Sequence, residues 1–264
     1  MSAGARHVRI DLGYDGTAFF GSQRQSERRT VQRELEAALK QLTNQDVWLA
    51  FAGRTDRGVH AVGQVASGSV LWRRDDESLR FALDSLTPDD VSITGVRTVD
   101  EAFHARYSAR SRVYRYRIWN GPTPPILVRR FVWHERAELN LAAMNVAAQC
   151  LIGEHDFASF AGDGLGVPGS GVDCTRTVLE ATWRSIADQW EPGGTIYEFE
   201  IRANGFLAHM VRNIVGNMCE VGRGRATPEW FEGVIARRDR RQAEAPAPPQ
   251  GLVLWSVEYP NDAG

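Results

Sequence analysis

The stretch GRTDRGVHA, residues 53–61, places three charged side chains between two segments with strand character. Residues 47–51 form a short apolar run and residues 64–71 are rich in β-branched and small residues, so both are predicted to be strands. If the connection is extended at Arg54 and Asp56, their side chains share one face, because strand side chains repeat every two residues. A guanidinium there favours an ionised Asp56, and Gly58 permits a turn.

An ionised aspartate in such a loop can act as a nucleophile. The same residue can instead close its own turn by accepting a backbone N–H. From the residues of the loop alone, both interpretations of Asp56 stay open.

The composition is that of a globular protein. The chain has 264 residues, 43% hydrophobic and 24% charged, which suits one large domain or two smaller ones. No apolar run of about 18 residues predicts a membrane span, and the first residues lead directly into a strand pattern, so we expect a cytoplasmic protein. Cys150, Cys174 and Cys219 lack metal or disulfide spacing, and we expect reduced thiols. No phosphate loop or histidine pair predicts a metal or cofactor.

The charge distribution is more informative than the net charge of −2. Residues 103–134 contain seven arginines, no Asp or Glu, and several interleaved aromatic rings, a combination that suits phosphates and unstacked bases. The alternative is a solvated strand face whose arginines pair with acidic residues elsewhere. The arginines are Arg106, Arg110, Arg112, Arg115, Arg117, Arg129 and Arg130.

Hydrophobic periodicity predicts alternating strands and helices, hence an α/β (α+β) fold. A helix is expected from Thr30, and Thr227-Pro228 is a typical helix start. The remaining expected strands are 8–14, 114–119, 195–201 and 252–259, and the remaining expected helices are 77–86, 141–152 and 206–221. We expect two halves: residues 1–105, which carry the Asp56 loop, and residues 106–264.

Five blocks in order resemble the TruA family of tRNA pseudouridine synthases. They are Arg54 to Ala61, Phe103-His104-Ala105-Arg106 through Tyr114-Arg115-Tyr116, Gly153 to Phe160, Phe206 to Gly216, and Ala245-Pro246-Ala247 to Leu252. The blocks span nearly the whole chain. The resemblance therefore favours the catalytic interpretation of Asp56 and implies a reaction that converts uridine to pseudouridine in tRNA.

The resemblance also implies roles for individual residues. Asp56 matches the catalytic aspartate that attacks a flipped uridine, at either C6 or C1′, and Arg54 matches the residue that assists extrusion of the base. Tyr114 is expected to pack on the uracil, and Arg212 to pair with the aspartate. Substrate contacts are expected from Arg24, Arg57, His60, Arg106, Arg110, Arg112 and Leu252.

The implied fold has two related halves that form one mixed, mainly antiparallel sheet, with packed helices and a central cleft. The implied partners are a second copy of the chain and the anticodon stem-loop of tRNA, at about positions 38–40, with no cofactor and no membrane. A tRNA-binding protein without useful catalysis, and a synthase acting on another RNA, stay open. A glycoside hydrolase would need a second acid near Asp56, for which Asp156 is the candidate.

Two positions depart from the family pattern. Ser22 stands where the family usually has Trp, and Asp84 stands where it often has Asn. Neither is expected to touch the reacting atoms. These two departures leave the details of RNA docking and of local packing open.

Overall fold

The computed structural model describes residues 5–162, 171–186 and 192–260. Contacts divide the chain into two units. The N-terminal unit comprises Met1–Arg112 and Leu254–Gly264, and the central unit comprises Val113–Val253. The halves expected from the sequence, by contrast, are continuous and divide at residue 105. Each unit is described by itself.

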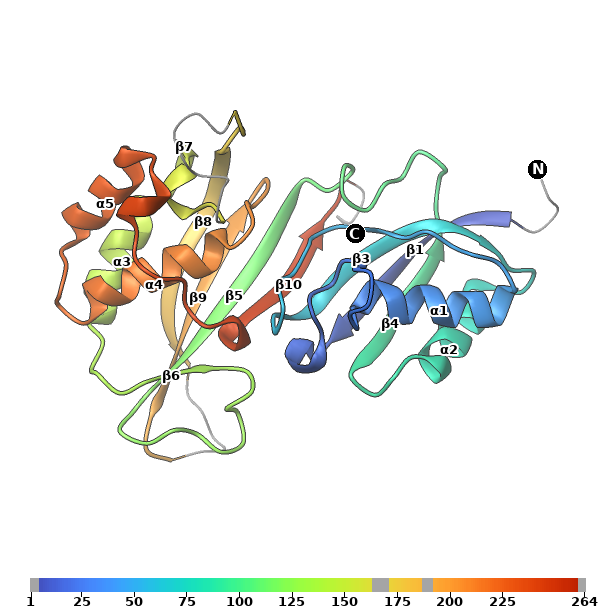
Figure 1. The fold of residues 1–264 in the computed structure, drawn as a ribbon, viewed down its shortest axis with the longest axis horizontal. Coiled ribbons are helices and arrows are strands. Elements are labelled where there is room, and N and C mark those ends of the chain that lie inside the picture. Colours follow the sequence, from blue (N-terminus) through green and yellow to red (C-terminus); the bar gives the residue numbers. More distant parts are fainter. Residues whose placement is uncertain (1–4, 163–170, 187–191, 261–264) are drawn as a thin grey trace. The chain divides into compact units, whose positions relative to one another are not determined.

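The N-terminal unit is a sheet with helices on one face (Figure 1). Its strands run in the order β4-β1-β3-β10, and β2 pairs with β3. Helices α1 and α2 contact each other and pack against β3 and β4. The elements are β1 (Ala5–Tyr14), α1 (Val31–Thr43), β2 (Ala50–Phe51), β3 (His60–Leu71), α2 (Asp76–Leu86), β4 (Val91–Thr98) and β10 (Leu252–Glu258), whose last five residues belong to this unit.

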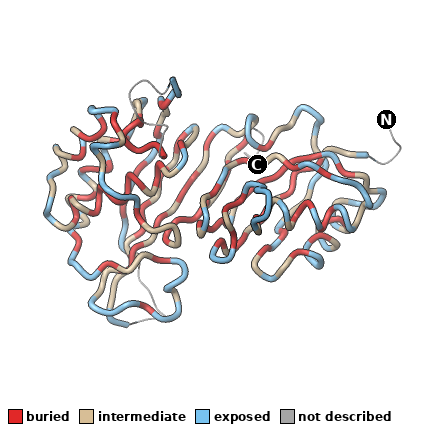
Figure 2. The backbone as a smooth tube through the Cα atoms, in the orientation of Figure 1, coloured by how far each residue is buried: buried red, intermediate tan, exposed pale blue. Residues whose placement is uncertain are grey.

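Alternation along β1 builds the core of the N-terminal unit. Val8, Ile10 and Leu12 are fully buried, and the antiparallel register sets Ile10 opposite Ala66 of β3. Apolar stripes of α1 and α2 cover these side chains, as the expected helix pattern requires. The helix expected from Thr30 is confirmed, and the Thr30 side chain caps it by accepting the Arg33 N–H. Figure 2 shows the resulting buried positions along the strands of this unit.

The described part of the central unit, residues 113–162, 171–186 and 192–253, combines antiparallel strands in the order β5-β9-β8-β7 with helices α3, α4 and α5. Strand β6 adds to β5 in parallel, so the sheet is mixed and mainly antiparallel, as expected. Figure 1 shows the helices against one face. The elements are β5 (Ser111–Asn120, from residue 113), β6 (Trp133–Glu135), α3 (Leu141–Gln149), β7 (Gly153–Asp156), β8 (Thr175–Ile186), β9 (Thr195–Ala203), α4 (Met210–Gly222) and α5 (Pro228–Arg237).

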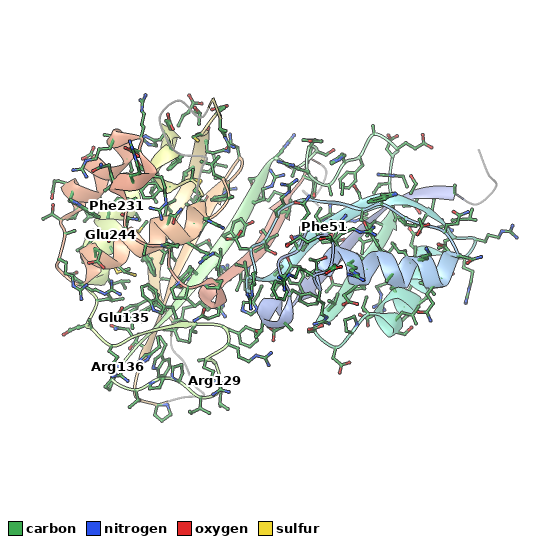
Figure 3. All side chains as sticks on the ribbon, in the orientation of Figure 1. Phe51, Arg129, Glu135, Arg136, Phe231 and Glu244 are labelled. Carbon is green, nitrogen blue, oxygen red and sulfur yellow. The ribbon has the colours of Figure 1, made fainter. Side chains whose placement is uncertain are left out.

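Aromatic pairs fill the core beneath these helices. Trp183 of β8 stacks on Phe199 of β9 with ring centroids 5.0 Å apart, and Phe160 stacks on Phe231 of α5 at 5.6 Å. The Phe231 side chain is labelled in Figure 3. Thr227 accepts the Trp230 N–H and Pro228 opens α5, which confirms the predicted helix start.

The opposite face of the central sheet is charged. Glu198 of β9 has no exposed side-chain surface and binds Arg117 (2.7 Å) and Arg184, while Arg115 reaches Glu200 (2.6 Å). Burial opposes ionisation of Glu198, but the hydrogen bonds from Arg117 and Arg184 outweigh it and lower its pKa. Arg115 and Arg117, which belong to the seven clustered arginines, therefore follow the alternative interpretation: they lie on a strand face and pair with acidic residues.

Several element boundaries differ from the prediction, among them those of α4, α3 and β2. Helix α4 begins at Met210 and not at residue 206, because His209 adopts a left-handed conformation (φ 62°) that ends the preceding turn. Helix α3 ends at Gln149, three residues before the predicted end. Only Ala50 and Phe51 of the predicted strand 47–51 pair with β3.

Candidate active site

The segment that carries Asp56 connects β2 to β3 in the N-terminal unit. Thr55 is buried while its neighbours Arg54 and Asp56 are exposed and half-buried, so the side chains alternate as predicted for an extended segment. Gly58 then has φ 78°, and the Val59 N–H donates to the Asp56 carbonyl at 3.1 Å. The backbone therefore turns directly after Asp56.

Hydrogen bonds from Tyr14, Ser22 and Gln64 fix the segment around Thr55. The Tyr14 hydroxyl lies 2.8 Å from Thr55 Oγ1. Ser22 Oγ accepts the Thr55 N–H at 2.9 Å, and the Ser22 N–H donates to the Thr55 carbonyl at 3.1 Å. Gln64 of β3 donates to Tyr14 Oη at 3.2 Å and to the Gly53 carbonyl at 2.8 Å. The peptide next to Asp56 is therefore held on both sides.

Burial has a chemical effect on Tyr14. Removal of its phenol from water raises the pKa of Tyr14 to about 12, although hydrogen bonds from Thr55, Gln64 and Ser22 oppose the shift. Tyr14 therefore stays neutral at physiological pH and can serve as a fixed hydroxyl beside Thr55.

Close packing against residues 16–21 also shapes this segment. A Cβ on Gly16 would lie 1.9 Å from the Val59 carbonyl oxygen, and one on Gly21 would lie 2.7 Å from that of Thr55. Gly21 also has φ 92°. Only glycine allows these approaches. Residues 16–21 therefore pack closely against the segment that carries Asp56 and restrict the path of its backbone.

Several predicted substrate contacts lie around this segment. Arg57 is exposed, and its guanidinium lies 4.4 Å from the centroid of the Phe20 ring. Arg112 donates to the Ala52 carbonyl at 3.1 Å, at the base of the segment. His60 is 2% exposed, and its Nδ1 accepts the Gly16 N–H at 2.9 Å and lies 3.2 Å from Asp15 Oδ1, so it is buried against the turn at residues 15–16.

The other predicted contacts of this unit lie on two further segments. Arg24 pairs with Glu36 at 3.2 Å and stacks on Trp48. Arg106 lies over the Tyr107 ring. The Arg110 N–H donates to the carbonyl of Glu258 in β10.

In the central unit, Tyr114, Arg212 and Leu252 come from three elements. Tyr114 of β5 is 7% exposed and meets Phe206 edge-on, with centroids 5.0 Å apart. Arg212 of α4 donates through Nε to the Ala247 carbonyl at 2.8 Å, and the Ala247 N–H donates back to the Arg212 carbonyl at 2.9 Å. Leu252 is buried at the start of β10.

The segment that receives Arg212 is fixed on α4. Asn217 Oδ1 accepts the backbone N–H of Glu244, which is labelled in Figure 3. A Cβ on Gly216 would lie 2.2 Å from the Ala245 carbonyl oxygen. Two blocks that share the family resemblance, residues 206–216 and 245–252, are therefore one packed substructure.

Sequence reasoning did not identify Tyr14, Gln64, Phe20 or Arg28 as part of the site. Ser22 and Asp84 were noted only as departures from the family. Ser22 now has a defined place against Thr55, and Asp84 Oδ1 accepts the Ile93 N–H at 2.8 Å. The replacement of Asn by Asp at residue 84 keeps this acceptor.

Residues 5–162, 171–186 and 192–260 carry neither a metal-binding cluster nor a membrane-spanning helix. No group of three or more His, Cys, Asp or Glu side chains in these ranges could hold a metal ion. No helix there has the length and apolarity needed to cross a membrane.

Comparison with known proteins identifies the family. A family model described as tRNA pseudouridine synthase matches residues 13–108 and 147–260. The tRNA pseudouridine synthase A of Cronobacter sakazakii is 41% identical over 96% of this chain and 90% of its own. That of Aeromonas salmonicida is 41% identical over 96% and 91%, and that of Shewanella denitrificans is 39% identical over 97% and 94%. A solved structure of an unknown protein from Galdieria sulphuraria, 12% identical over 75% of this chain and 81% of its own, has a TM-score of 0.24, too low to bear on the fold. This chain belongs to the tRNA pseudouridine synthase family.

Proposed function

We propose that this chain isomerises uridine to pseudouridine in the anticodon stem-loop of tRNA, at about positions 38–40, with Asp56 as the catalytic carboxylate. The observation that carries the proposal is the fixed Thr55 peptide, held by Tyr14 and Ser22, which presents the neighbouring Asp56 at a turn. A nucleophile needs a defined position to profit from proximity to its substrate.

The reaction is an internal rearrangement. The bond between C1′ and N1 breaks, the freed uracil turns, and a bond between C1′ and C5 forms. The proton on C5 leaves and N1 gains a proton, so atoms and electrons balance without a redox cofactor. Asp56 adds to C6 of the base or to C1′ of the sugar, and its carboxylate is released at the end of either route.

The other predicted catalytic residues would act around this step. Arg54, exposed beside Asp56, would assist extrusion of the uridine. Tyr114, ordered by the Phe206 ring, would pack on the uracil, a contact worth about 1–3 kcal/mol per base. Arg212, oriented by the Ala247 carbonyl, would pair with the Asp56 carboxylate. Residues 1–105 would supply the aspartate and residues 106–264 would complete the cleft.

Exposed cation and ring pairs would supply RNA contacts. Tyr107 is 76% exposed and is flanked by His104 at 4.5 Å and Arg106 at 5.7 Å. Such a ring can stack on an unpaired base while the guanidinium meets a phosphate. A cytoplasmic homodimer, in which one tRNA contacts both subunits, completes the proposal.

The test is tritium release from unmodified tRNA labelled at C5 of uridine, since formation of the new bond expels that hydrogen. Asp56→Asn should abolish release and keep tRNA affinity within a few-fold. Asp89→Asn is the matched control, because Asp89 is an exposed carboxylate of the same unit, and it should retain full release. Release that survives in Asp56→Asn would contradict the assignment. Tight tRNA binding by the unaltered protein without release would indicate a binding protein or another RNA target.

A further inference from the structure

Two arginines converge on one aromatic ring next to Asp56. The guanidinium carbon of Arg28 lies 4.7 Å from the centroid of the Phe20 ring, and that of Arg57 lies 4.4 Å from the same centroid. Both arginines are exposed, and Phe20 is half-buried. Arg57 directly follows Asp56, whereas Arg28 comes from the segment before α1.

Neither arginine has a carboxylate partner among the ion pairs formed by the described residues. The adjacent Arg29 illustrates the usual arrangement: it binds both oxygens of Asp90 at 2.7 and 2.9 Å and Glu34 at 3.0 Å. These bonds to Asp90, and to a lesser degree to Glu34, raise the pKa of Arg29 despite its burial. The Arg28 and Arg57 pair thus concentrates positive charge that no described carboxylate neutralises.

The ring that holds the two guanidinium groups is fixed to the Asp56 segment. The Phe20 N–H donates to the Arg29 carbonyl at 2.9 Å, and Gln25 Nε2 donates to the Phe20 carbonyl at 2.7 Å. The Gly58 N–H donates to the Phe19 carbonyl at 3.4 Å. An anion bound at this ring would therefore keep a constant position relative to Asp56.

Charge and shape together define the ligand. Because the two guanidinium carbons lie 4.7 and 4.4 Å from the same ring centroid, they are separated by less than roughly one Debye length (about 10 Å at 0.1 M salt). An anion beside the ring is therefore attracted by both. Planar guanidinium groups donate paired hydrogen bonds to phosphate oxygens. Because the arginines cover the Phe20 ring, that ring is not available to stack on a base.

We propose that Arg28, Phe20 and Arg57 form a binding site for a phosphodiester group of the RNA backbone beside the uridine that Asp56 attacks. The inference rests on the proposed function in that its ligand is RNA. Phosphate contacts fix the position of a nucleic acid without reading its bases. This site would hold the backbone at the strand from which the nucleotide is extruded.

The experiment measures the dissociation constant for tRNA as a function of salt in the Asp56→Asn background, where no turnover occurs. Because both guanidinium groups bind the same phosphate, the double variant of Arg28→Gln and Arg57→Gln loses one neutralised phosphate and should reduce the slope of log Kd against log salt by about 0.7–0.9. For this double variant, the loss of affinity at 50 mM salt should exceed that at 200 mM by about 3-fold. Unmodified and fully modified tRNA should show the same change.

Arg73→Gln is the matched control, since Arg73 is exposed and follows the far end of β3, about 40 Å along the strand from His60. It should leave the slope unchanged. Phe20→Leu keeps both charges but removes the ring, so it should raise Kd by about 2- to 5-fold with an unchanged slope. An unchanged Kd in Phe20→Leu overturns the role of the ring.

The inference is overturned if the double variant keeps the slope of the parent, whether or not its affinity falls, or if Arg73→Gln changes the slope equally. A defect confined to unmodified tRNA would show base recognition and would also overturn it. The outcome does not depend on tritium release. A changed slope with no release in the unaltered protein would leave the phosphate site standing and refute only the proposed reaction.

Discussion

Replacement of Glu198 by Gln removes the carboxylate that three arginines of the central unit share. Arg117 Nε lies 2.7 Å and Arg115 Nε 3.7 Å from its oxygens, and Arg184 completes the group. The Glu198 side chain is 0% exposed, so the pairs with Arg115 and Arg117 act at reduced dielectric screening. Arg184 contributes less because its side chain is 48% exposed.

The expected loss lies between two limits. A charge-assisted hydrogen bond contributes about 1.5–3 kcal/mol, and breaking a fully buried ion pair costs about 3–5 kcal/mol. Since the arginines keep partial contact with water, we expect Glu198→Gln to lower the free energy of unfolding by about 2–3 kcal/mol. In a chain of this size the melting temperature should fall by about 5–10 °C.

The pH dependence gives an independent test. The pKa of Glu198 is lowered below its ordinary 4.5, so the native state binds fewer protons than the unfolded state and the stabilisation is present above that value. It is lost as the pH falls through the lower pKa of the folded protein. The difference in melting temperature between the parent and Glu198→Gln should therefore be large at pH 7 and shrink as the pH falls below 4.5.

Thermal unfolding followed by circular dichroism measures both effects. Glu180→Gln is the control, because Glu180 pairs with Arg202 on the same sheet face but its side chain is 55% exposed. It should cost less than about 1 kcal/mol. Equal losses in the two variants at pH 7, or a Glu198 effect that persists undiminished at low pH, would refute the reasoning.

Three further predictions concern the site and its supports. Tyr14→Phe removes a buried hydroxyl that contacts Thr55 and Gln64, so the free energy of unfolding should fall by about 1–3 kcal/mol and tritium release should slow. Chemical denaturation measures the first effect and the release assay the second. An unchanged rate of release would show that the hydrogen bond to Thr55 does not position Asp56. Gly216→Ala should cost about 1–3 kcal/mol or more because its Cβ meets the Ala245 carbonyl, whereas Gly233→Ala, with open space around it in α5, should gain about 0.5–1 kcal/mol; melting temperatures of opposite order would contradict the packing argument. Arg212→Lys keeps the charge but loses the guanidinium bond to Ala247, so kcat should fall while the melting temperature stays within a few degrees, and wild-type kcat would remove Arg212 from the proposed mechanism.

Local signals in the sequence were sufficient for much of the fold. The helix starts at Thr30 and Thr227 follow from side-chain capping, which acts over three residues. Strand β8 was not identified, and its register shift between Val178 and Glu180 explains why: the alternation changes phase there, leaving Leu179 44% exposed. Helix α4 was predicted to start too early because the left-handed backbone of His209 has no signature in hydrophobic periodicity.

The candidate site also combines features that the sequence predicts with features that it does not. The position of Asp56 at a turn is readable from Gly58 and the extended residues before it. The contacts of Thr55 with Tyr14 and Ser22 join residues more than 30 positions apart, and no spacing rule predicts them. Nor does periodicity reveal which sheet a final strand joins, so the assignment of Leu254–Gly264 to the N-terminal unit could come only from the structure.

That last strand has a consequence for the order of folding during synthesis. The N-terminal unit needs residues 254–258: the Trp255 carbonyl lies against Gly63 of β3, and the Glu258 carbonyl accepts the Arg110 N–H. A ribosome must therefore extend the chain through the whole central unit before the unit that holds Asp56 can close. Vectorial synthesis thus delays closure of the N-terminal unit until the central unit has already been made, and a fragment that ends at Arg112 should not fold stably.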